Sequence, residues 1–77
     1  MNAEMHDFGD GNGPVSAYRH PNGGGWVAET AGVADTAYVG PDAAVFGRAV
    51  VSDRARVFGR ALVFGRALVS GRARVYD

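Results

Sequence analysis

A valine recurs at every sixth position from Val27 to Val75 without a single exception. An alanine stands four places after each of the first eight of these nine valines. A fixed period of six residues is typical of a parallel β-helix, in which each hexad supplies one short strand and one corner. The repeat therefore predicts an all-β solenoid.

Each position of the hexad has an expected place in the structure. Successive side chains of a strand point to opposite faces, so we expect the valine to point into the core at mid-strand. The alanine would fill the narrower space beside the corner. The two residues between them form the corner, and most of these pairs contain Gly, Asp or Pro, which favour turns. The pair Glu29-Thr30 has none of the three and is the weakest corner.

The chain divides into three parts around this repeat. Residues 1–14 are rich in glycine and show no periodicity, so we expect a flexible arm. Residues 15–26 hold a strand-like stretch and then three consecutive glycines, which predicts a cap followed by a glycine-rich turn. Residues 27–77 form the repeat. A length of 77 residues leaves room for one domain.

Composition excludes several classes of protein. The chain has no cysteine, so neither a disulfide framework nor a thiolate zinc site can form. No apolar run approaches the length of a membrane-spanning helix, and the polar, acidic N-terminus is unlike a secretory signal. We therefore expect a soluble, cytoplasmic protein with no membrane partner.

The net charge is zero, but the two signs are separated along the chain. Residues 1–45 carry six carboxylates against one arginine, a net charge of −5. Residues 46–77 carry seven arginines against two carboxylates, a net charge of +5. Because sequence order is axial order in a solenoid, we expect an acidic end and a basic end.

The stretch from Val27 to Val75 resembles the hexapeptide-repeat family, which includes the trimeric hexapeptide acyltransferases. This chain is much shorter than those enzymes. The resemblance implies a left-handed parallel β-helix with three hexads per coil, here about 2.7 to 3.5 coils. Residues 18 apart in the sequence would then stack on one another.

Stacking at this interval places large apolar side chains on one outer face, although they point away from the core. Monomeric proteins rarely leave such a patch exposed to water, so we expect self-association into a homodimer or homotrimer. The alternative is that the N-terminal arm covers the face, to which it could contribute Phe8. The expected interface consists of Trp26, Ala28, Ala44, Phe46, Leu62 and Phe64.

Few residues suit catalysis or metal binding. Acyltransferases of the family use a histidine as general base, and its carbonic anhydrases need three histidines for zinc. This chain has only His6 and His20. We therefore expect no metal, no cofactor and no catalytic residue, and we interpret His20 as a cap for the turn at residues 23–25.

Arginines fill the same corner position in five successive hexads, and further arginines and aromatic residues share a neighbouring face. Such a surface would suit an acidic protein or a nucleic acid, or it would simply keep an apolar solenoid soluble. The residues are Arg48, Arg54, Arg56, Phe58, Arg60, Arg66, Arg72, Arg74 and Tyr76.

The sequence thus favours a non-enzymatic protein–protein interaction or assembly module that associates with itself. Three alternatives remain at this point. One is a small phage or mobile-element inhibitor, similar to an anti-CRISPR protein, that blocks a host defence or nucleic-acid enzyme. The second is a fragment or relative of an acyltransferase. The third is a structural piece such as the tip of a longer fibre.

Overall fold

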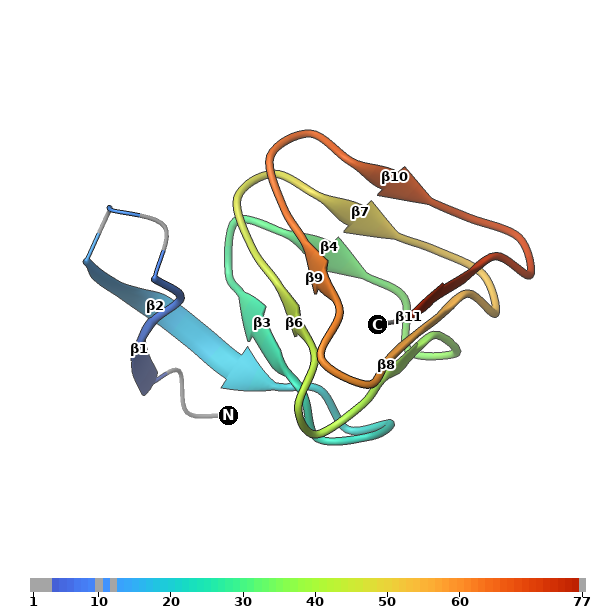
Figure 1. The fold of residues 1–77 in the computed structure, drawn as a ribbon, viewed down its shortest axis with the longest axis horizontal. Helices are drawn as coiled ribbons and strands as arrows, with labels where there is room; N and C mark the ends of the chain where they lie inside the picture. Colours follow the sequence, from blue (N-terminus) through green and yellow to red (C-terminus); the bar gives the residue numbers. More distant parts are fainter. Residues whose placement is uncertain (1–3, 10, 12, 77) are drawn as a thin grey trace.

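The computed structural model describes residues 4–9, 11 and 13–76. This part of the chain is all-β and contains eleven strands and no helix (Figure 1). The strands are β1 (Glu4–Asp7), β2 (Pro14–Arg19), β3 (Trp26–Ala28), β4 (Gly32–Val33), β5 (Tyr38–Val39), β6 (Ala44–Val45), β7 (Val50–Val51), β8 (Arg56–Phe58), β9 (Leu62–Val63), β10 (Leu68–Val69) and β11 (Arg74–Tyr76). The described residues therefore contain no helix that could cross a membrane.

From β3 onward the chain visits three sheets in turn. Strands β3, β6 and β9 lie side by side in the first sheet, β4, β7 and β10 in the second, and β5, β8 and β11 in the third. All pairs within these three groups are parallel. Figure 1 shows the resulting circuit, in which each lap lies beside the one before it.

The lap length is 18 residues. Val27 is the register partner of Val45, which in turn pairs with Val63. The same interval relates Val39 to Val57 and Val57 to Val75. Three hexads therefore make one circuit of the three sheets, as the resemblance implies.

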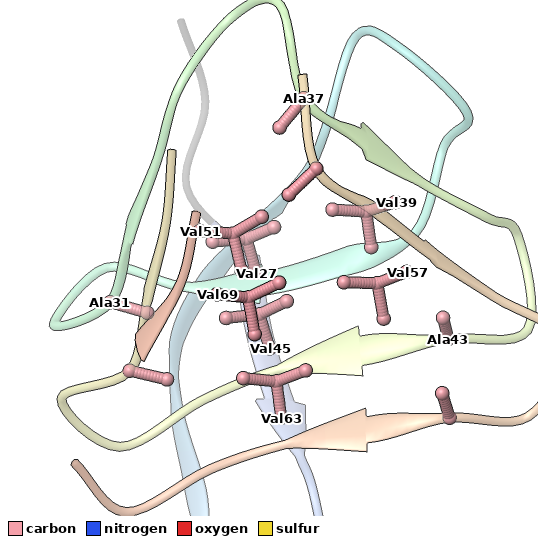
Figure 2. Close-up of a cluster of buried hydrophobic side chains, with 13 residues drawn as sticks. Val27, Ala31, Ala37, Val39, Ala43, Val45, Val51, Val57, Val63 and Val69 are labelled. Atoms are coloured by element: carbon pink, nitrogen blue, oxygen red, sulfur yellow. The ribbon is translucent and has the colours of Figure 1, made fainter. Parts of the chain in front are cut away.

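Most of the repeated valines and alanines form the core, as expected, but Val33 and Val75 are only partly buried. Val27, Val39, Val45, Val51 and Val57 are fully buried, and Figure 2 shows their side chains converging between the sheets with those of the alanines. Each buried valine removes apolar surface from water and contributes about 1.5 kcal/mol. The alanines of the first two laps are buried as well, whereas Ala67 and Ala73 on the third lap are exposed.

The corners of the second and third laps use the left-handed region of backbone conformation. Gly47, Gly59, Gly65 and Gly71 have φ values between 65° and 71°, and Asp53, at the equivalent place, has a φ of 59°. Glycine adopts this conformation without steric penalty, whereas other residues do so at a cost. Asp53 gains a compensating contact, since its Oδ2 accepts a hydrogen bond from the backbone N–H of Gly71 at 3.2 Å.

Part of the predicted N-terminal arm forms a strand, while residues 1–3, 10 and 12 of that arm lie outside the described residues. Residues 4–7, which we placed in a flexible arm, form β1, and β1 pairs antiparallel with β2. Strand β2 pairs antiparallel with β3 and so joins the hairpin to the first sheet. The strand was missed because its sequence, Glu-Met-His-Asp, has no apolar alternation. Pairing with β2 and the stacking of His6 on Trp26 place this strand.

Candidate binding surfaces

The outer face of the first sheet carries a column of stacked aromatic rings. The Phe46 ring lies between those of Phe8 and Phe64, with centroid distances of 4.9 and 5.4 Å. Ala28 precedes Phe46 by one lap, and this small residue is buried under the hairpin. Phe8, reaching over from beyond β1, thus supplies the ring that the first lap lacks.

The hairpin also covers Trp26. The imidazole of His6 stacks on its indole with the ring centroids 4.3 Å apart, and the guanidinium carbon of Arg19 lies 4.6 Å from the indole centroid. Sequence reasoning named neither His6 nor Arg19 as a partner of this tryptophan. Both lie in segments without the six-residue period, so the repeat gave no signal for them.

The expected apolar interface is therefore only partly exposed. Ala28 and Phe46 are 1% and 5% exposed, because the hairpin lies over the first part of the face and covers them within one chain. Trp26 and Ala44 are half-buried. Leu62 and Phe64 remain 52% and 57% exposed. Over the first two laps the N-terminal segment covers the face, as in the alternative prediction. Only the part of the expected interface on the third lap remains exposed.

A second surface is a groove on the third sheet and the corner before it. It encloses about 790 Å³, and no carboxylate is among the residues that line it. The lining residues are Asn22, Thr36, Tyr38, Arg54, Arg56, Phe58, Arg72 and Arg74. We call this concavity the arginine groove.

Two adjacent laps supply the four arginines in matching positions. Arg56 on β8 is the register partner of Arg74 on β11. Arg54 and Arg72 precede these strands by two residues, and the Arg54 N–H donates to the carbonyl of Gly71 at 3.0 Å. Neighbouring strands lie about 4.8 Å apart. The four guanidinium groups therefore project from a compact two-by-two array.

The first lap places neutral residues at the equivalent positions. Tyr38 is the register partner of Arg56, and Thr36 stands two residues before it. The Thr36 hydroxyl donates to the carbonyl of Asp53. Asn22 is fixed nearby, because its side-chain amide donates to the carbonyl of Ala37 at 3.1 Å. The groove thus has a neutral, hydrogen-bonding end and a strongly positive end.

The structure divides the predicted arginine surface. Arg54, Arg56, Arg72, Arg74 and Phe58 line the groove. Tyr76 lies at its edge, with its ring 5.2 Å from that of Phe58, and is 67% exposed. The remaining three arginines do not line it. Arg48 and Arg66 lie at the corner after the first sheet, and Arg60 at the corner after the third.

His20 is buried, at 2% exposure. Its backbone caps the glycine turn as expected, since its N–H donates to Gly25 and its carbonyl accepts from Gly24. The side chain instead reaches the first lap, where Nε2 lies 2.9 Å from the carbonyl oxygen of Ala37. A carbonyl can only accept, so Nε2 carries the proton. The buried Nδ1 has no hydrogen-bond partner among the described residues.

No cluster of three or more metal-ligating side chains occurs in the part of the chain that the structure describes. Comparison with protein-family models, with curated proteins and with solved structures finds no match to this chain.

Proposed function

We propose that this protein is a non-enzymatic interaction module that associates with itself, built as a short left-handed parallel β-helix. The 18-residue register and the three sheets visited in turn support the β-helix. The handedness follows the resemblance to hexapeptide-repeat proteins. The interface is the exposed remainder of the first sheet's outer face, namely Leu62 and Phe64 on the third lap.

The aromatic column carries this proposal. Phe46 has a ring on each side of it, whereas Phe64 stacks on Phe46 alone and stays 57% exposed. Leu62, two residues earlier on the same side of the strand, is also exposed. Burying two large apolar side chains contributes about 1.5–3 kcal/mol each. A second copy of the chain can satisfy both residues at once, because a two-fold contact presents the same patch from each side.

A matched pair of substitutions tests the interface. Phe64→Arg should convert the protein to a monomer in sedimentation analysis over a concentration series, because it places a charge in the apolar contact. Leu68→Arg adds the same charge at a still more exposed position on the second sheet, where Leu68 is 69% exposed. It should leave association unchanged. A wild-type chain that stays monomeric at high concentration, or a loss caused equally by Leu68→Arg, would refute this interface.

A further inference from the structure

We propose that the arginine groove binds single-stranded nucleic acid, with the four arginines on successive phosphates and Tyr76 against an unstacked base. The proposal uses the groove of a single copy and does not depend on self-association.

The four arginines of the groove concentrate positive charge. Arg56 and Arg74 lie directly opposite each other on neighbouring parallel strands, and Arg54 and Arg72 repeat this arrangement at the corner. Like charges facing each other across strands repel, so the array is unfavourable unless anions lie between its members. No carboxylate lines the groove itself, although Asp53 lines a smaller adjoining pocket together with Arg54 and Arg72. The groove can therefore accept an external polyanion.

The use of arginine and the aromatic residues beside it indicate which class of polyanion the groove binds. Every basic residue of the chain is arginine, whose planar guanidinium binds phosphate oxygens in pairs and also stacks on bases. Phe58 lines the groove, and Tyr76 continues its stack at the groove edge with most of its ring exposed. An acidic peptide would occupy the arginines but leave this aromatic surface unused. A nucleotide chain offers phosphates and planar bases together.

The extent of the positive surface favours a single strand over a duplex. Residues 1–45 carry a net charge of −5, so the region beyond the neutral end of the groove repels a long polyanion. A base can also reach Tyr76 only when it is not paired and stacked within a duplex. The groove therefore suits a stretch of a few unpaired nucleotides.

Fluorescence anisotropy with a labelled ten-nucleotide oligothymidine at low salt tests the proposal. Arg56→Gln combined with Arg74→Gln should weaken binding by at least about tenfold. It should also reduce the slope of log affinity against log salt by about 0.7 for each arginine removed. The matched control, Arg48→Gln with Arg66→Gln, removes the same charge from two residues that are also 18 apart but outside the groove. It should change affinity by less than about twofold.

Two further measurements distinguish single-stranded nucleic acid from other polyanions. Tyr76→Ala should weaken oligothymidine binding by at least about fivefold, which a purely electrostatic surface would not show. A ten-residue oligoglutamate and a ten-base-pair duplex should both compete poorly. No binding at low salt, equal losses in the two arginine pairs, an unaffected Tyr76→Ala variant, or equal competition by either polyanion would overturn the proposal. Circular dichroism of each variant verifies that it is folded.

Discussion

Phe8 stacks on Phe46 with a centroid distance of 4.9 Å, although 38 positions separate the two residues in the sequence. This contact connects the hairpin to the second lap, beyond the first-lap strand with which β2 pairs. It accounts for the burial of Phe46, which a solenoid without the hairpin would expose.

The aromatic contact should be measurable as a coupling energy. We expect Phe8→Ala and Phe46→Ala each to lower the free energy of unfolding, with a coupling of about 0.5–1.5 kcal/mol in a double-mutant cycle. Urea denaturation gives the four required values. Met5→Ala, at an exposed position of β1, serves as control and should not couple to Phe46→Ala. Strictly additive effects of Phe8→Ala and Phe46→Ala would show that the hairpin is held by other contacts.

Two corner glycines in the same column should respond differently to alanine. Gly47 and Gly65 have nearly the same positive φ, so each substitution introduces backbone strain of about 1 kcal/mol. At Gly47 an added Cβ would also lie 2.9 Å from the backbone nitrogen of Gly65, whereas at Gly65 it meets nothing within 4 Å. Gly47→Ala should therefore lower the free energy of unfolding by clearly more than Gly65→Ala. Equal losses in thermal or urea denaturation would contradict this close approach.

Repulsion between the arginines of the groove should lower the free energy of unfolding at low salt. Arg56 faces Arg74 across the strand pair, and removing one charge by Arg56→Gln relieves the repulsion. We expect a gain of about 0.5 kcal/mol at low ionic strength that disappears in 1 M salt, where screening is nearly complete. Arg60→Gln, at another corner, controls for net charge and should give no such gain. A salt-independent effect of Arg56→Gln would point to packing rather than charge.

Tyr18 should contribute a dependence of stability on alkaline pH. Burial raises the pKa of its hydroxyl above the usual value of 10.0, and the negative charges of Asp35 and Glu29 add to the effect. Above pH 10 the unfolded chain therefore loses this proton before the folded chain does. The stabilisation is complete below pH 10 and declines as pH rises through the pKa of the folded state.

Thermal denaturation between pH 9 and 12 measures this decline. Tyr18→Phe should make the fall in midpoint temperature shallower, since phenylalanine has no proton to lose. Tyr76→Phe, which removes an exposed hydroxyl, is the comparison. If the two variants follow the same curve, Tyr18 does not produce the pH dependence.

Sequence reasoning predicted the ladders well because their cause is local and periodic. Val27, Val45 and Val63 stack because every hexad carries the same inward residue, and a period of six with three sheets sets the register. The first strand could not be predicted this way. His6 and Phe8 find their partners across the outside of the solenoid, and no periodic signal marks such a contact.

The sequence predicted which residues of the candidate surfaces lie next to each other, but not which of them are exposed or line the groove. The 18-residue interval placed Phe46 and Phe64, and likewise Arg56 and Arg74, next to each other. It could not reveal that Phe46 is covered, because that depends on the hairpin. It also assigns Arg48 and Arg54 to different corners, but it could not show which of these corners borders a groove.

The hairpin of β1 and β2 forms a flap beside the parallel strands, joined to them by the antiparallel pairing of β2 with β3. Segments with few buried apolar groups open more readily than core strands, so amide hydrogens of residues 4–7 should exchange with solvent sooner than those of β6. Each opening would release Trp26 and Phe46 from their ring partners. The hydrophobicity of this side of the protein would then vary with time, set by how often the flap lifts.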